Sequence, residues 1–148
     1  MIKGYTNIEQ SKELAKILPL ESADMHYATW TILDGGFIVS PNQGRTIEDL
    51  QEDYGNQIIP CWSLAALLNL LPSEFTQKGK YSTTTYKIDI RKYKFTDDVD
   101  LHQIAYGSIK FDVDGQYSFK DMVNTGEKEN LVDACYEMVT ILKKRNLI

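Results

Sequence analysis

Residues 78–94 combine positive charge with tyrosines and hydroxyl side chains. Six basic residues and one acidic residue give this stretch +5, so the rest of the chain carries −10. Such a surface suits a phosphate-bearing ligand, a nucleic-acid strand or an acidic protein partner. A more common role for lysines on a strand is to guard a sheet edge against aggregation. The candidate binding residues in this stretch are Lys80, Tyr86, Lys87, Arg91 and Lys92, and Trp30 from an earlier segment is added to them.

Cys61 is the best candidate for a nucleophile, because it precedes an apolar, helix-like segment. A helix N-terminus lowers the pKa of a thiol, and His26 or His102 would have to complete the catalytic pair. The simpler interpretation is a buried thiol that helps to lock the start of the helix. Cys135 also lies in an apolar helical pattern, so we expect two buried free thiols and assign no catalytic residue.

Metal and cofactor signals are weak throughout the chain. The two histidines and two cysteines are scattered singly, without the spacing of a zinc site. Asp112-x-Asp114-Gly115 begins like a calcium loop, but Val123 stands where that loop needs its closing Glu, so a hairpin turn is predicted. No glycine-rich phosphate loop is present. We expect neither a metal nor a cofactor.

Length and charge favour one intracellular domain. The 148 residues predict a single globular domain over 1–148, and a net charge of −5 disfavours general binding to nucleic acid or to anionic membranes. The longest apolar stretch, 58–71, is interrupted by polar residues, so no membrane-spanning segment is expected. The N-terminus lacks an apolar signal core, and the cysteines show no disulfide framework. A cytoplasmic location is therefore predicted.

Helical periodicity predicts three helices, over 7–18, 62–71 and 131–145, and a short acidic helix over 46–54. Thr6 and Glu9 have capping-box spacing at the first helix, and Thr46 and Asp49 have it at the short one. Asn130 can cap the last helix.

Alternation of apolar and polar residues predicts strands in the remaining segments. Residues 25–33 and 37–39 indicate a hairpin across a turn at 34–36. Residues 81–93 alternate well, 104–113 form a strand with a bend or break near Gly107, and 117–119 follow a turn at 114–115. These patterns predict an α+β fold with a mostly antiparallel sheet of about four to six strands and about three helices packed on it.

Two motifs carry a resemblance, IPCWSLAALLNLLP at 59–72 and NLVDACYEM at 130–138. The chain resembles, over most of its length, a group of small uncharacterised proteins encoded in bacterial genomes and in phages or mobile elements of gut bacteria. The resemblance implies a bacterial, intracellular protein with a phage or mobile-element role, and it supplies no catalytic residue.

Besides direct DNA binding, which the net charge disfavours, three function hypotheses remain from the sequence. The leading one is a non-enzymatic binding or adaptor protein that contacts another protein or a second copy of itself. One alternative is a small-ligand or nucleotide-binding module that uses residues 78–94. The other is a cysteine-dependent enzyme, the least favoured because the nucleophile pair is not visible in the sequence.

Overall fold

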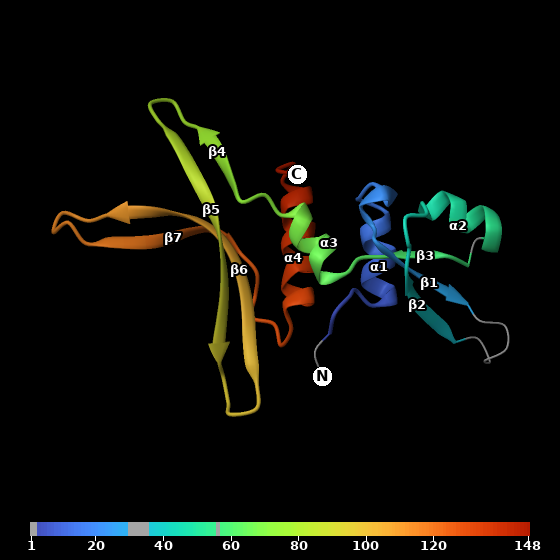
Figure 1. Ribbon diagram of the computed structural model, residues 1–148. Coiled ribbons are helices and arrows are strands. Elements are labelled where there is room, and N and C mark those ends of the chain that lie inside the picture. The colour runs from blue at the N-terminus through green and yellow to red at the C-terminus, as the bar shows by residue number, and fades with distance from the viewer. Residues whose placement is uncertain (1–2, 30–35, 56) are drawn as a thin grey trace. The chain divides into compact units, whose positions relative to one another are not determined.

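The computed structural model describes residues 3–29, 36–55 and 57–148. The chain divides into two compact units, Met1–Leu70 and Leu71–Ile148, which are described separately. The α+β prediction is confirmed, with four α-helices and two antiparallel sheets in the described part of the chain (Figure 1). The strands form one sheet of three and one of four, where the sequence had predicted a single sheet.

The first unit is built on a three-stranded sheet in the order β2-β1-β3. Both partners of the central strand pair with it in antiparallel register, so the predicted hairpin of the first two strands is present. Two residues of its predicted turn, 34 and 35, lie outside the described residues. The elements of this unit are α1 (Ile8–Ala15), a 3-10 turn (Leu20–Ser22), β1 (Met25–Thr29), β2 (Phe37–Pro41), α2 (Ile47–Tyr54), β3 (Ile59–Cys61) and α3 (Leu64–Leu70).

The capping box of α1 lies one residue later than predicted. Asn7 accepts from the Gln10 amide at 2.8 Å, and the Gln10 side chain accepts from the Asn7 amide at 3.1 Å. Thr6 is fully buried instead, and its hydroxyl accepts from the Trp62 amide at 3.2 Å. The prediction that Thr6 caps the helix is wrong, because its hydroxyl serves as the hydrogen-bond acceptor of the buried Trp62 amide instead. The Thr46–Asp49 capping box of α2 is confirmed.

The helix predicted over 62–71 is shorter, because its first two residues pair with the segment before α1. Cys61 ends β3, where it pairs opposite Met25, and α3 starts at Leu64. Ser63 marks the boundary, since its hydroxyl accepts from the Ala66 amide at 3.1 Å. The Thr6 amide donates to the Trp62 carbonyl at 3.0 Å, and Ser63 forms an antiparallel bridge with Tyr5. This pairing with a distant segment overrides the apolar helical pattern at residues 62 and 63.

The second unit contains a four-stranded antiparallel sheet in the order β4-β5-β6-β7 and one long helix. The helix is capped by Asn130, as predicted, and it packs against β6. The first strand was not predicted, because its polar sequence, Glu-Phe-Thr-Gln-Lys, carries little apolar signal. The elements are β4 (Glu74–Lys78), β5 (Thr83–Lys94), β6 (Asp100–Phe111), β7 (Tyr117–Asn124) and α4 (Leu131–Lys144).

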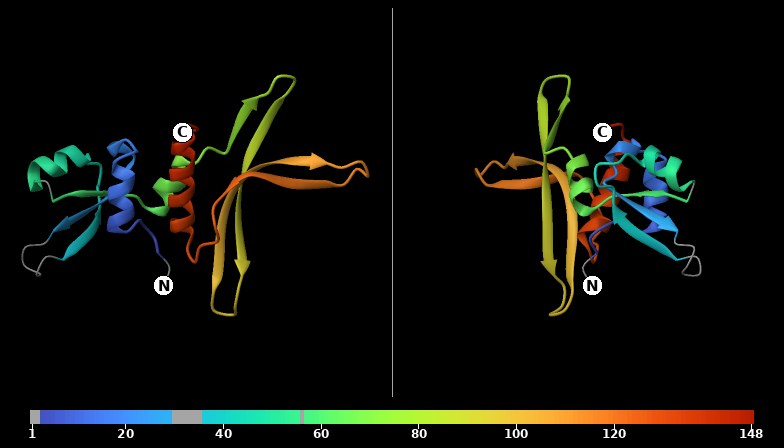
Figure 2. Two further views of the ribbon diagram at one scale, coloured as in Figure 1. Left: turned by 180° about the vertical axis from the view of Figure 1, so that it is seen from behind. Right: turned by 45° about the vertical axis from the view of Figure 1, so that its right-hand side comes forward.

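Each long strand of this sheet changes its partner along its length. Residues 83–87 of β5 pair with β4, whereas residues 87–94 pair with β6. Residues 100–107 of β6 pair with β5, residues 105–111 pair with β7, and beyond Gly107 only the β7 pairing continues. β5 and β6 therefore separate beyond the pair Lys87–Gly107, and the β6–β7 hairpin projects away from the β4–β5 end in every view (Figures 1 and 2). We call residues 107–121 the β-arm.

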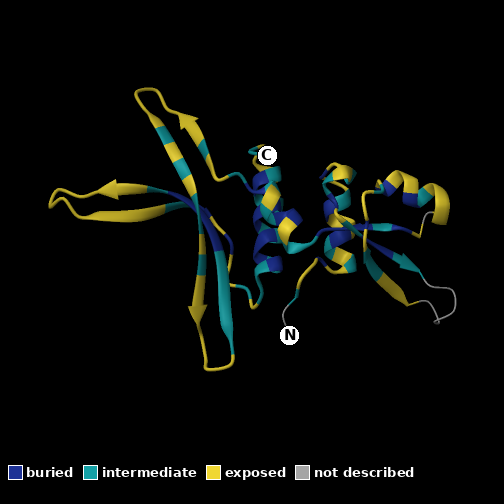
Figure 3. Cartoon of the chain, in the orientation of Figure 1, coloured by how far each residue is buried: buried dark blue, intermediate teal, exposed yellow. Residues whose placement is uncertain are grey.

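The core of the second unit lies where α4 meets the middle of β6. Ile104 and Tyr106 on the strand are fully buried, as are Cys135, Met138 and Leu142 on the helix. Burial stops beyond Gly107, and residues 109–120 are all exposed (Figure 3). Only the root of the β-arm thus belongs to the core.

Candidate binding surface on the four-stranded sheet

The β-arm carries an apolar side that no other described element of the second unit covers. Cross-strand pairing places Ile109 opposite Phe119 and Phe111 opposite Tyr117, so these four side chains share one side of the hairpin. Their exposed fractions are 59%, 37%, 72% and 72% in that order. Grouped exposed apolar side chains of this size are typical of an interaction surface.

The opposite side of the β-arm is polar and cationic. Ser108 pairs with Lys120, and Lys110 pairs with Ser118. The hairpin closes through Asp112, whose carboxylate accepts from the amides of residues 114 and 116 at 2.9 Å each. The predicted hairpin turn at 114–115 is therefore confirmed, and its carboxylate serves the turn.

The apolar side of β6 switches at Gly107. Before this residue the large buried side chains, Ile104 and Tyr106, are at even positions, with only the small Ala105 buried between them. Beyond it the large apolar side chains, Ile109 and Phe111, are at odd positions. Because successive side chains of a strand point to opposite faces, the two apolar sides lie on opposite faces of the strand. A helix that covers the first cannot cover the second.

Gly107 is required at this switch by close packing. β6 runs unbroken through Gly107, and the irregularity expected near this residue is a shift of register with β7 between Tyr106 and Gly107. A Cβ at position 107 would lie 2.4 Å from the Lys120 carbonyl oxygen and 2.5 Å from the Phe119 ring. The ring therefore lies directly over the glycine backbone, a close approach that a side chain would prevent.

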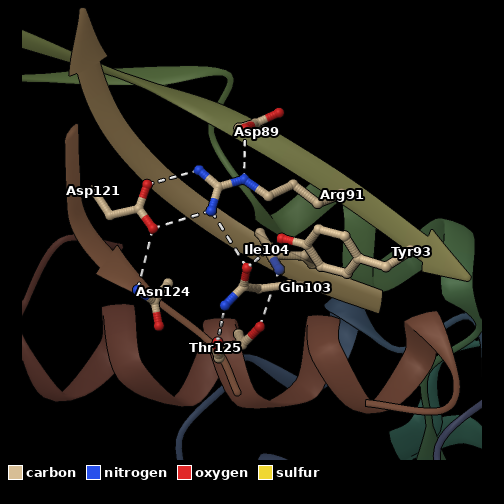
Figure 4. A network of polar contacts seen from close by, with 8 residues as sticks. All are labelled: Asp89, Arg91, Tyr93, Gln103, Ile104, Asp121, Asn124 and Thr125. Carbon is tan, nitrogen blue, oxygen red and sulfur yellow. Dashed lines mark hydrogen bonds and ion pairs between the residues drawn. The ribbon is translucent and has the colours of Figure 1, made fainter. Parts of the chain in front are cut away.

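Arg91 fastens the root of the β-arm to the neighbouring strands (Figure 4). Its guanidinium donates to both carboxylate oxygens of Asp121, at 2.7 and 3.1 Å, and to Asp89 at 2.7 Å. It also lies 5.4 Å from the centroid of the Phe119 ring. Hydrogen bonds from this guanidinium lower the pKa of Asp121, and Asp121 in turn raises the pKa of Arg91.

Gln103 and Thr125 extend this network towards the core. The Gln103 side chain accepts from Arg91 at 3.3 Å and from the Tyr93 hydroxyl at 2.9 Å, and it donates to the Thr125 carbonyl at 2.9 Å. The buried Thr125 hydroxyl accepts from the Ile104 amide at 3.0 Å. The network holds β5, β6 and β7 together where the β-arm leaves the sheet.

A groove of about 460 Å³ lies in the fork where β5 and β6 separate. Threonine hydroxyls line its β5 side, and the root of the β-arm forms the other side. Its lining residues are Thr83, Thr84, Thr85, Lys87, Gly107, Ser108, Ile109, Lys110 and Phe119. This volume is within the range of small-ligand sites, and the groove combines basic, hydroxyl and aromatic side chains.

The residues predicted from the basic stretch do not form one site. Lys87 lines the groove, whereas Arg91 is engaged by carboxylates and Lys92 pairs with Asp100 at 3.0 Å. Tyr86 lies on the opposite face of the strand, with its ring 5.5 Å from that of Phe75. Lys80 lies in the exposed turn after β4. Trp30 lies outside the described residues.

The edge-strand interpretation of this stretch is wrong for the strand as a whole. β5 lies between β4 and β6 in the sheet order. Each half of β5 nevertheless pairs with a neighbour on one side only, except at Lys87 where the halves meet. The sequence missed the aromatic side of the β-arm, although alternation over 109–113 and 117–119 around the Asp-Gly turn could have indicated an amphipathic hairpin.

Cys61 does not have the geometry of an activated nucleophile. The thiol is fully buried and lies 3.6 Å from the Thr6 hydroxyl oxygen. Burial raises the pKa of the Cys61 thiol, which is opposite to what a thiolate nucleophile needs. Burial also raises the pKa of Cys135 to about 12. Both cysteines are free and buried, as predicted.

A second hollow, of about 390 Å³, lies beside β1, β2 and α2 in the first unit. His26 lines it, with Nδ1 2.9 Å from the Asn42 side-chain oxygen, and Asn42 donates to the Ala23 carbonyl at 2.9 Å. Arg45 at its rim pairs with Asp53. These polar groups already have partners within the first unit, so they hold the β1–β2 hairpin and its neighbours together. We do not assign this hollow as a ligand site.

Searches for similarity give no identification. No protein-family model matches the chain, and no curated protein or solved structure is significantly similar to it. Among residues 3–29, 36–55 and 57–148, no helix is long and apolar enough to span a membrane, and no three His, Cys, Asp or Glu side chains gather as metal ligands would. The β-arm and the groove at its root are therefore the features from which a function can be argued.

Proposed function

We propose that this is a non-enzymatic binding or adaptor protein whose protein partner covers the apolar side of the β-arm. The observation that carries the proposal is the switch at Gly107. Beyond this residue the large apolar side chains are at odd positions, so Ile109 and Phe111 lie on the face of β6 opposite Ile104 and Tyr106, which pack against α4. Together with Tyr117 and Phe119 they form an aromatic-rich group on a projecting hairpin, and aromatic residues are enriched at the centres of protein interfaces.

Two further features support binding through this hairpin. A two-stranded hairpin is marginally stable by itself, and here the Arg91 network and the packing over Gly107 hold its root in place. A preorganised surface loses less conformational entropy when a partner binds. The resemblance to bacterial phage and mobile-element proteins favours a cytoplasmic partner, and that origin remains part of the proposal.

Site-specific photocrosslinking tests this function. Benzoylphenylalanine at position 111 samples the apolar side, and the same residue at position 118 samples the polar side of the same hairpin as a matched control. In cells that naturally produce the protein, we expect position 111 to yield one discrete protein adduct that position 118 does not. The purified partner should then bind the unmodified chain and lose binding to Phe111→Ser. Equal adducts from both positions, or none, would overturn the proposal.

A phosphate-bearing small ligand in the groove is the second candidate function. Lys87, Lys110 and the threonine hydroxyls of residues 83–85 support it, because cations and hydroxyl donors together suit a phosphate. Thermal-shift measurements with nucleotides and sugar phosphates test this candidate, since a ligand selective for the folded state raises its Tm. No shift at millimolar ligand would remove it.

A further inference from the structure

The groove beside the β-arm contains two open strand edges. The Ile88 amide donates to the Ser73 carbonyl, on the β4 side of β5. Because successive backbone groups alternate between the two edges of a strand, those of Thr83 and Thr85 point away from β4 and into the groove. In the described pairing, no strand lies beside them on that edge.

The same alternation opens the edge of β6. The Thr125 amide donates to the Ile104 carbonyl and the Asp112 amide to the Gln116 carbonyl, so even-numbered residues of β6 face β7. The backbone groups of Ile109 and Phe111 therefore face the groove, where β5 no longer pairs with them. Unpaired edges of this kind are templates for an added strand.

Side-chain chemistry selects which strand would fit the β6 edge. On one face an added strand would meet Ile109 and Phe111, and on the other it would meet Lys110. Neither Lys110 nor Lys87 forms an ion pair with any described residue, although Glu74 lies opposite Lys87 in the β4–β5 register. Lys87 lies opposite Gly107, on the face of Ile109 and Phe111, so Lys110 is the uncompensated charge that complements acidic side chains on the other face of an added strand.

We infer that the open edge of β6 in this groove accepts an extended peptide segment of a partner protein in which apolar and acidic residues alternate. The inference rests on the proposed function and names the chemistry of the partner. A nucleotide or nucleic-acid strand would neutralise Lys87 and Lys110, but it would leave the strand edges at 109–111 without the regular N–H and C=O partners that a peptide provides. The backbone edge therefore favours a peptide.

Binding of defined peptides to the full chain tests the inference. The probe is a fluorescein-labelled octapeptide of alternating valine and glutamate, compared with a block peptide of the same composition and with an alternating valine–lysine peptide. We expect fluorescence anisotropy to detect the alternating acidic peptide alone. We also expect that peptide to slow hydrogen exchange at the amides of Ile109 and Phe111.

Two variants with matched controls separate charge from edge pairing. Lys110→Glu should weaken the acidic peptide about tenfold or more, since it replaces an attraction with a repulsion, while Lys144→Glu on α4 makes the same charge change away from the groove. Ile109→Pro should abolish binding, because proline removes an edge N–H that has no strand partner in the described ladder, whereas Ile109→Val keeps that N–H.

The outcomes distinguish the possible occupants of the groove. Equal binding of the block and alternating peptides, or no effect of Ile109→Pro, would overturn the inference. Stronger protection of 109–111 by ATP or oligodeoxythymidylate would assign the groove to a phosphate-bearing ligand instead. Protection that increases with protein concentration, without peptide, would assign it to a second copy of the chain. A crosslink from position 111 with no peptide binding would retain the proposed function and remove only this inference.

Discussion

The two halves of β6 are alike in sequence and opposite in environment. Ile104 and Tyr106 pack under α4 with no exposed surface, whereas Ile109 and Phe111, a few positions later, are exposed at 59% and 72%. Both halves carry large apolar side chains in alternation, which is the pattern of a strand with one buried face. The comparison teaches that apolar alternation alone does not determine burial. α4 buries one half of β6, and the proposed function assigns the cover of the other half to a partner protein.

The largest expected effect compares one residue type in both halves. Ile104→Ala should destabilise the second unit by about 2–5 kcal/mol, because it leaves a cavity in a fully buried position. Ile109→Ala should change stability by no more than about 0.5 kcal/mol, because that side chain is largely exposed. Native-state hydrogen exchange of β6 and α4 is the appropriate measurement, since both tryptophans of the chain are in residues 1–70 and their fluorescence would not report on this unit. Equal losses for the two variants would show that Ile109 is covered within the monomer.

Substitution at the boundary between the halves should have the next largest effect. Gly107→Ala should destabilise the β-arm by about 1–3 kcal/mol, because the new Cβ would collide with the Lys120 carbonyl and displace the Phe119 ring. The expected readout is faster hydrogen exchange at residues 108–121 with α4 little affected. Gly115→Asn at the hairpin tip, where φ is +77° and no atom lies within 4 Å of an added Cβ, is the matched control. Unchanged exchange in Gly107→Ala would contradict the packing described at the switch.

Charge at the root of the β-arm should give a smaller, pH-dependent effect. Asp121→Asn should cost about 1–2 kcal/mol at pH 7, since it weakens a two-point hydrogen bond to Arg91. Arg91 lowers the pKa of Asp121, so the folded state binds this proton less readily than the unfolded state does, whose carboxyl has a pKa of about 3.9. The stabilisation is therefore present above that pH and lost as the pH falls through the lowered folded value.

The corresponding measurement is the free energy of unfolding of Asp121→Asn and the natural chain between pH 2 and pH 7. We expect the two to converge as the pH falls below about 4. A difference that stays constant over this range would show that the variant acts through packing rather than through the charge of Asp121.

The smallest effect is expected at the exposed ion pair between Lys92 and Asp100. The lysine side chain is 64% exposed and the pair lies at the far end of the sheet from the β-arm. Lys92→Gln should therefore change stability by less than about 1 kcal/mol, and high salt should remove the difference. A larger loss of stability that salt does not remove would mean that the exposure of this ion pair does not predict its contribution to the free energy of unfolding.

Much of the fold follows from local sequence signals. The helix over 131–145 with its Asn130 cap, the Thr46–Asp49 capping box and an irregularity at Gly107 are all found close to their predicted positions. These signals depend on neighbours a few residues apart, so sequence is sufficient to show them. The failures involve distant partners. The cap at Thr6 was lost to Trp62, and β4 gained its pairing from β5 despite a polar sequence.

The candidate site shows the same division. The sequence located the positive charge of residues 78–94, and Lys87 does line the groove. It did not show that Arg91 is held by Asp121 or that Lys92 is held by Asp100, because those contacts join strands separated along the chain.

By itself, the sequence determined the types of residue, the alternation of apolar and polar positions, and the turns that break it. Only the tertiary structure decided which apolar side is buried. α4 packs on the half of β6 that contains Ile104 and leaves the half that contains Ile109 uncovered. The physical reason is that alternation fixes the direction of a side chain relative to its own strand, whereas burial depends on which surface arrives from elsewhere in the chain or from a partner.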